Sequence, residues 1–192
     1  IQEIWQQAGL NPAALRIQTT RPQPLLTYCV QYGETDLNFL QRLCECYGLF
    51  YYFEHTADQH TMVVVDGKEH CPKVDPVSYQ PDSGQNPDHP VLSQFDWQFT
   101  ATTEQASVDE YDFTHPRFDL TGNTAHAKHE WYQYGTQHDV QSQAASKASL
   151  IFAQQQHERQ RIFARSNVRN IYPGSFLPVT EHPQPELNLM WL

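Results

Sequence analysis

The sequence has little positive charge. It carries 12 Lys and Arg residues against 22 Asp and Glu residues, which gives a formal net charge of −10 over 192 residues. Proteins that bind DNA or RNA draw much of their affinity from clustered Lys and Arg that neutralise phosphates. The composition therefore predicts no nucleic-acid partner.

Long apolar runs are also missing. No stretch approaches the roughly 20 apolar residues that a membrane-spanning helix requires, so we expect no stable membrane insertion by this chain. The first residues do not form a basic and then apolar leader, and no targeting signal is predicted. Helical spacing that starts at Ile1, and an apolar run over 187–192, lead us to expect a piece cut from a longer protein.

Motifs for catalysis and cofactor binding are absent from the sequence. Only eight glycines are present, and none of them forms the nucleophile elbow GxSxG, the phosphate loop GxxxxGK[ST] or the dinucleotide motif GxGxxG. The sequence therefore predicts no enzyme, no catalytic residue and no cofactor.

Four cysteines occupy positions 29, 44, 46 and 71, without a CxxC pair of the kind that binds zinc. A chain of this size does not need disulfides for stability, so we expect free thiols. Cys44 and Cys46 are two positions apart in a predicted helix, where their side chains point about 200° apart. They are expected neither to bridge each other nor to bind one metal.

Ten histidines leave one metal hypothesis open. His126, His129 and His138 form the densest group, and two His three residues apart on a helix can share a face. Their pattern, HAKHE, differs from the HExxH pattern of zinc proteases. Surface histidines are the preferred interpretation, so no metal site is predicted. A small metal-dependent hydrolase that uses these three residues is the alternative.

The segment 26–70 has the clearest pattern. Apolar and polar residues alternate over 26–32, which predicts a half-buried strand. A helical apolar stripe follows from 37 to 47, with Thr35 or Asp36 as N-cap and Gly48 as C-cap. Segments 49–54 and 61–66 are rich in aromatic and β-branched residues and predict a β-hairpin. The pattern indicates a helix packed on a small antiparallel sheet.

The remaining sequence predicts a β-rich region of α+β class. We expect a partial helix and connector over 1–25, an exposed loop with five prolines over 70–90, and a β-rich region over 91–192. Within that region we expect strands at 91–100 and 107–113 and a long helix over about 139–160. Segments 162–171 and 176–180 are expected to form a β-hairpin around the turn at Pro173 and Gly174.

The run YCVQYGETDLNFLQRLCECYGLFYYFEH, followed by HTMVVVDG, resembles the VgrG spike proteins of bacterial type VI secretion systems. Those proteins carry a run close to QYRETDLDFLSRLLEEEGIYYYFEH and then an apolar strand that ends in Asp. The matching positions are Gln31, Tyr32, Glu34, Thr35, Asp36, Phe39, Arg42, Leu43, Gly48, Tyr51, Tyr52, Phe53, Glu54, His55 and Asp66.

Weaker matches continue in the family's order. EYDF with a later proline resembles the family's DYDFxxP, and NVR followed by PGSF and HP resembles NVRxLxPGxxFxLxxHP. Gly33 stands where Arg is usual. The further signature positions are Tyr111, Asp112, Phe113, Pro116, Pro173, Gly174 and Phe176.

The resemblance implies the gp27-like hub region, with barrel-like β domains, a small helix-on-sheet insertion and a second barrel that is incomplete here. It implies a homotrimer that caps the Hcp tube, carries the puncturing needle and its tip proteins, and delivers effectors. The assembly would form in the bacterial cytoplasm and then be secreted or translocated. A phage-tail hub, or a receptor-binding or glycan-binding module that uses Tyr51 and Tyr52, is the alternative.

Overall fold

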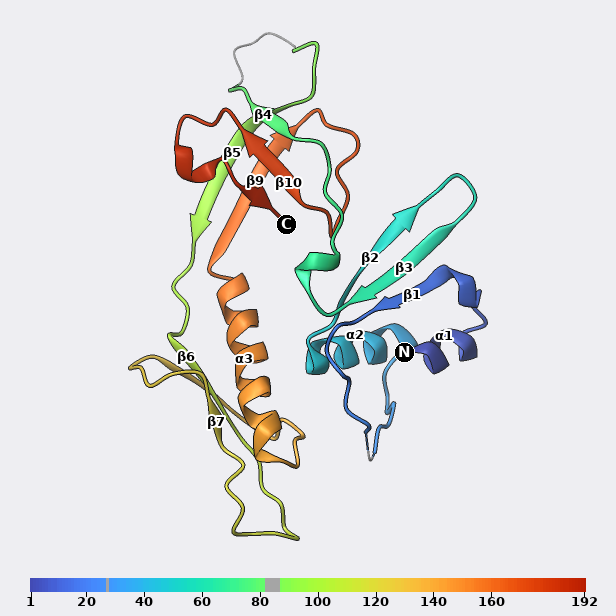
Figure 1. Cartoon of the computed structure of the whole chain (residues 1–192), viewed down its shortest axis with the longest axis vertical. Coiled ribbons are helices and arrows are strands. Elements are labelled where there is room, and N and C mark those ends of the chain that lie inside the picture. Colours follow the sequence, from blue (N-terminus) through green and yellow to red (C-terminus); the bar gives the residue numbers. More distant parts are fainter. Residues whose placement is uncertain (27, 82–86) are drawn as a thin grey trace. The chain divides into compact units, whose positions relative to one another are not determined.

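The computed structural model describes residues 1–26, 28–81 and 87–192. The chain forms two compact units, the first made of residues 1–94 and 165–192 and the second of residues 95–164 (Figure 1). The expected α+β class is confirmed, and the three sheets each combine parallel and antiparallel neighbours. The predicted β-rich region 91–192 is divided between the two units.

The first sheet has the order β1–β3–β2, with β1 at Leu15–Gln18, β2 at Phe50–His55 and β3 at His60–Val65. The predicted hairpin is confirmed, because β2 and β3 pair antiparallel from Phe50↔Val65 to His55↔His60. β1 adds to the other edge of β3 in parallel. Apolar residues on both faces of β3 are buried: Met62 and Val64 on one face, Val63 and Val65 on the other.

Two helices accompany this sheet, α1 at Gln2–Gln7 and α2 at Asp36–Tyr47 (Figure 1). The predicted ends of α2 are confirmed. The Thr35 hydroxyl accepts a hydrogen bond from the Asn38 amide, and Gly48 is left-handed with φ 63°. α2 places Leu40 and Cys44 against Met62 and Val64, and Trp5 of α1 packs against the same cluster.

The predicted strand over 26–32 is wrong. Residue 27 lies outside the described residues, and the others have no regular structure. Tyr28 and Tyr32 are exposed by 83% and 90% of their surface. Both edges of the central strand β3 are already paired, one of them with β1, which lies in the segment expected to be connector.

The second sheet has the order β11–β10–β4–β5–β9. Its strands are β4 (Val77–Tyr79), β5 (Val91–Phe99), β9 (Gln160–Ser166), β10 (Leu177–Thr180) and β11 (Met190–Trp191). The predicted hairpin of segments 162–171 and 176–180 is wrong, because β9 pairs with β5 and β10 pairs with β4 and β11. The Pro-rich segment was expected to be an exposed loop, yet it contributes β4 and buries Val77; residues 82–86 lie outside the described part.

The second unit contains the sheet β7–β6–β8 and helix α3. Its strands are β6 (Gln105–Asp109), β7 (Gly122–Asn123) and β8 (Glu130–Tyr134). The long helix predicted at about 139–160 is observed as α3, Gln141–His157, and it packs Ala144 and Ala148 against Val108. A Cβ atom at Gly122 would lie 2.5 Å from the backbone of Ala144, so glycine permits this close packing.

Three short 3₁₀ turns complete the described elements, at Pro12–Ala14, Lys68–His70 and Pro185–Leu187. Among the helices that the structure describes, none has the length and apolar character needed to cross a membrane.

Candidate functional site

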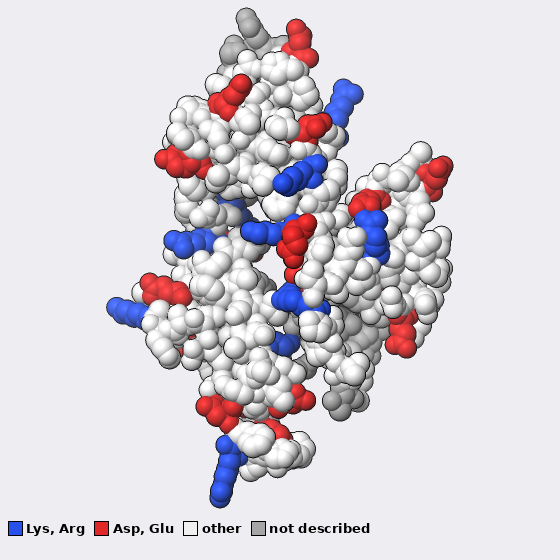
Figure 2. Space-filling view, in the orientation of Figure 1, with Lys and Arg blue, Asp and Glu red and all other residues white. Residues whose placement is uncertain are grey.

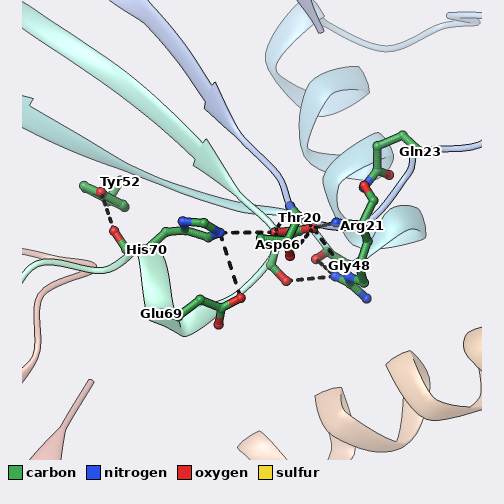
Figure 3. Close-up of polar contacts among 8 residues, drawn as sticks. All are labelled: Thr20, Arg21, Gln23, Gly48, Tyr52, Asp66, Glu69 and His70. Atoms are coloured by element: carbon green, nitrogen blue, oxygen red, sulfur yellow. Dashed lines mark hydrogen bonds and ion pairs between the residues drawn. The ribbon is translucent and has the colours of Figure 1, made fainter.

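A connected polar cluster of the first unit surrounds Asp66 (Figure 3). β1 and β3 are parallel, with Gln18 opposite Val65, so the residues that follow each strand meet at the same edge of the sheet. This brings Thr20 and Arg21 to Asp66. The side chain of Asp66 is fully buried.

Backbone amides hold the Asp66 carboxylate. The Thr20 amide donates to Oδ1 at 3.0 Å and to Oδ2 at 2.9 Å, and the Arg21 amide donates to Oδ2 at 2.7 Å. The guanidinium of Arg21 lies 3.5 Å from Oδ2. It also donates to the carbonyl oxygens of Asp66 and Gly48, at 2.8 and 3.0 Å. Arg21 therefore connects the end of β3 to the C-cap of α2.

The electrostatic environment of Asp66 favours its charged form. Burial by itself raises the pKa of the carboxyl group, but the amide hydrogen bonds from Arg21 and Thr20, together with the Arg21 charge, outweigh burial and lower the pKa below its ordinary value. Asp66 is therefore a structural anion at neutral pH.

Glu69 and His70 lie on the other side of Asp66, in the 3₁₀ turn Lys68–His70 (Figure 3). His70 Nε2 is 3.6 Å from Asp66 Oδ1 and 3.9 Å from Glu69 Oε1. The nitrogen is buried and has no hydrogen-bond partner among the described residues. The His70 carbonyl accepts a hydrogen bond from the Tyr52 hydroxyl at 3.0 Å, which fixes the turn against β2.

The first signature run surrounds helix α2. Arg42 donates to Glu34 through Nη2 at 2.5 Å and Nε at 3.2 Å, and these hydrogen bonds lower the pKa of Glu34. The Arg42 guanidinium also lies 5.0 Å from the centre of the Phe39 ring and donates to the Val30 carbonyl. Arg42 thus holds the irregular segment before α2 against the helix.

Other positions of this run lie at the ends of α2 and on β2. The Gln31 side-chain amide, Nε2, donates to Asp36 Oδ1 at 2.8 Å, beside the helix N-cap, whereas Tyr32 is exposed and Leu43 is half-buried. On β2, Tyr52 is buried, while Tyr51 and Phe53 touch edge to face on the opposite side of the strand. Residues 51 and 52 therefore do not share one face, as a paired glycan platform would require.

The signature segment that runs from NVR through PGSF to HP lies beside the first signature run. Gly174 has φ 78°, and a Cβ atom there would lie 2.4 Å from Tyr52 Cβ. The neighbouring Phe176 donates its amide to the Pro72 carbonyl at 2.8 Å, while Pro173 is exposed. Two signature segments far apart in the sequence are therefore in contact within the first unit.

The signature segment EYDF, with its later proline, lies in the second unit and forms a surface turn. Asp112 accepts hydrogen bonds from Thr114 and His115, which lower its pKa to about 2. Tyr111 and Phe113 are exposed by 58% and 82%, and Pro116 is exposed as well. This segment makes mainly local contacts.

The three histidines of the metal alternative are engaged separately. His138 is buried between the Thr136 hydroxyl and the Leu120 carbonyl, at 2.8 and 2.6 Å. His129 contacts Glu104, and His126 is exposed outside any helix. Within the described ranges, the residues whose ligand atoms lie within 4.8 Å of one another are instead Asp66, Glu69 and His70.

Sequence reasoning matched Asp66 to a family position but missed the residues around it. Thr20 and Arg21 lie in a segment expected to be connector, and Glu69 and His70 lie at the start of the expected Pro-rich loop. The available signal was a charged residue directly after three valines of a buried strand, since a buried carboxylate needs donors.

Comparison with known proteins gives one family match over the whole chain. The family model described as "Phage tail baseplate hub (GPD)" matches residues 1–192. The spike protein VgrG4b of the type VI secretion system of Pseudomonas aeruginosa is 32% identical over 197 residues, which cover 98% of this chain and 24% of that protein. The actin cross-linking toxin VgrG1 of Vibrio cholerae is 25% identical and covers 98% of this chain and 18% of that protein.

Among solved structures, the Escherichia coli protein c3393 superposes with a TM-score of 0.64 at 12% identity, over 96% of this chain and 38% of that chain. It is described as a component of the type VI secretion system with structural similarity to the T4 bacteriophage tail proteins gp27 and gp5. The chain thus spans about a quarter of VgrG4b and less than half of the solved protein.

Proposed function

This chain belongs to the phage tail baseplate hub family, and we propose that it forms part of the hub of a type VI secretion spike. The observation that carries the proposal is the 32% identity to VgrG4b, which extends over 98% of the chain. The shared fold with c3393 supports the same assignment.

The proposed hub is a homotrimer. Assembly of this kind needs side chains that are exposed in one copy and apolar enough to be covered by another. The second unit offers such side chains, all but one of them aromatic. They are Phe99, Tyr111, Phe113, Phe118, Trp131, Tyr132, Tyr134, Val140 and Phe163.

We further propose that the complete protein caps the Hcp tube and carries the needle, its tip proteins and effectors into a target cell. It would assemble in the bacterial cytoplasm before translocation. The role proposed for this segment is structural and not enzymatic, because the charged residues Arg21, Arg42 and Asp66 hold backbone segments together. On the face drawn in Figure 2, charged side chains are scattered and uncharged residues cover most of the surface.

A segment exchange tests the proposal. Residues 1–192 would replace the matched segment of VgrG4b in a strain that lacks its own spike proteins, and Hcp in the culture medium would be measured. We expect the chimera to restore Hcp release and to have the mass of a trimer by light scattering. A folded, well-expressed chimera that remains monomeric and releases no Hcp would contradict the proposal. A Gly174→Ala chimera serves as the control for a damaged hub.

A phage-tail hub is the second candidate, favoured by the family match over residues 1–192. The two candidates differ in the tube that the hub must cap. If the chimera forms a trimer but binds only a phage tail-tube protein, and not Hcp, the phage assignment would replace the secretion assignment.

A further inference from the structure

We propose that Asp66, Glu69 and His70 bind a divalent cation, with Zn²⁺ preferred over Ca²⁺ and Mg²⁺. The inference concerns a site at the end of β3 and does not depend on the proposed hub function. It rests on four observations about these residues and their surroundings.

The spacing of the ligand atoms fits a shared cation. Zn²⁺ binds imidazole nitrogen at about 2.0–2.1 Å and carboxylate oxygen at about 2.0–2.2 Å, so two of its ligands lie about 3.3 Å apart at a tetrahedral angle and about 4.2 Å apart when opposite. The observed separations from His70 Nε2, 3.6 Å to Asp66 Oδ1 and 3.9 Å to Glu69 Oε1, fall between these limits. Both exceed the length of a hydrogen bond.

The orphaned nitrogen is the second observation. His70 Nε2 is buried, has no hydrogen-bond partner in the described chain, and faces two carboxylate oxygens (Figure 3). In a neutral imidazole whose proton is on Nδ1, this nitrogen is an acceptor, so three acceptors would face one another. A cation between them satisfies all three at once.

The Asp66 oxygen on the side of His70 is still able to coordinate a cation. Oδ2 accepts the short bond from the Arg21 amide and lies beside the guanidinium. Oδ1 accepts only the shared Thr20 amide at 3.0 Å and the Thr20 hydroxyl at 3.3 Å. Oδ1 is the oxygen that is 3.6 Å from His70 Nε2.

Glycine at position 67 provides the fourth observation. A Cβ atom at Gly67 would lie 2.1 Å from Glu69 Oε1, although the backbone φ of −159° suits any residue. The exposed Glu69 carboxylate lies over Gly67 and 3.9 Å from His70 Nε2, where a Cβ atom at residue 67 would displace it. This placement brings a second negative charge beside Asp66, and the two carboxylates outnumber the single Arg21 cation.

The ligand set decides the preferred metal. One imidazole nitrogen with two carboxylate oxygens suits Zn²⁺, which accepts mixed nitrogen and oxygen ligands in a four-coordinate site completed here by water. Ca²⁺ needs six to eight oxygen ligands, and Mg²⁺ retains most of its water. Bound Zn²⁺ would fix the Lys68–His70 turn to the end of β3 and, through Asp66, to the residues after β1.

Zinc binding by the 192-residue chain, stripped with a chelator, tests the proposal by competition with a chromophoric chelator. We expect one equivalent of Zn²⁺ per chain and weaker binding of Ca²⁺. Glu69→Gln and His70→Gln should each weaken binding at least about 100-fold, because losing even a supporting partner of a ligand costs about 10- to 100-fold. Co²⁺ in place of Zn²⁺ should give a visible absorption band that His70→Gln removes.

The matched control is the double variant His55→Ala/His60→Ala. These exposed histidines face each other across the hairpin, with Nδ1 atoms 2.5 Å apart, and are the rival pair of imidazoles in the first unit. The control should bind Zn²⁺ as the parent chain does. Binding that is lost in the control but kept in His70→Gln, or no binding tighter than about 100 µM, would overturn the proposal. If His70→Gln is misfolded by circular dichroism, Glu69→Gln decides, because the Glu69 side chain is 59% exposed.

Discussion

Strands β3 and β8 each belong to a three-stranded sheet, but their side chains have opposite surroundings. β3 is central, pairs with β1 and β2, and buries Met62–Val65 inside the first unit. β8 lies at the edge of its sheet, pairs with β6, and leaves all five residues exposed, although three of them are aromatic. β3 stabilises the folded chain, whereas β8 leaves apolar surface exposed, where we propose that another copy of the chain packs.

The largest expected effect tests how tightly the buried region is packed. Gly174→Ala should destabilise the first unit by about 3 kcal/mol, because a left-handed backbone costs about 1–2 kcal/mol for alanine and crowding against Tyr52 adds about 1–3 kcal/mol. Urea denaturation, with hydrogen exchange of the β3 amides, measures the loss.

Gly9→Ala is the control for this change. Gly9 has a similar φ of 71°, but a Cβ atom there would meet nothing within 4 Å. It should cost only about 1 kcal/mol. Equal losses in the two variants would show that Tyr52 is not packed closely against residue 174.

The next effect concerns the charge at the end of β3. Asp66→Asn should cost about 2 kcal/mol at pH 7, since hydrogen bonds to a charged group contribute about 1.5–3 kcal/mol. The folded-state pKa of Asp66 is below its ordinary value of 3.8, so its contribution is present above that pH and is lost as the pH falls through the folded pKa. Denaturation curves of both proteins, recorded with EDTA at pH 7 and pH 3, should therefore differ less in free energy of unfolding at pH 3 than at pH 7. A stability difference between the two proteins that is larger at pH 3 than at pH 7 would contradict this prediction.

Val64→Ala directly tests the burial of β3. Val64 has no exposed surface and packs between Leu40, Cys44 and Met62. Removing two methyl groups should cost about 2 kcal/mol, from lost burial and the cavity that remains. Chemical denaturation measures this value, and a loss below about 0.5 kcal/mol, typical of surface sites, would place Val64 outside the core.

Tyr134→Ser on β8 should have the smallest effect on the single chain. Tyr134 is 58% exposed, so the free energy of unfolding should change by less than about 0.5 kcal/mol. In the chimeric spike, the same change should weaken the trimer, as seen by mass in light scattering over a dilution series. If the single chain lost much stability and the trimer were unchanged, Tyr134 would serve folding rather than assembly, and the contrast between β8 and β3 would be wrong.

Several features of the first unit could be predicted from the sequence because their causes are local. The cap residues Thr35 and Gly48 act within one turn of α2, and β2 and β3 are joined by the short segment 56–59. The strand predicted over 26–32 failed because alternation describes which side chains could share a face, not whether the segment pairs with another strand. β1, β4 and the partners of β10 depend on pairing between distant segments, which periodicity does not encode.

The candidate site around Asp66 was likewise only partly predictable from the sequence. The position of Asp66 after three valines is visible in the sequence. Thr20 reaches Asp66 only because β1 and β3 are parallel, and His70 faces it only because the 3₁₀ turn bends back. The cluster therefore could not be assembled from spacing alone.

The parallel pairing of β1 with β3 also has a kinetic consequence. The β2–β3 hairpin closes over a short loop, and hairpins form in about 1–10 µs. β1 and β3 are separated in the sequence by α2 and β2. The pairing of β1 with β3 is therefore the slower, non-local step. Until then, Met62–Val65 presents an unpaired apolar edge, and refolding at high protein concentration is expected to lose material to intermolecular strand pairing.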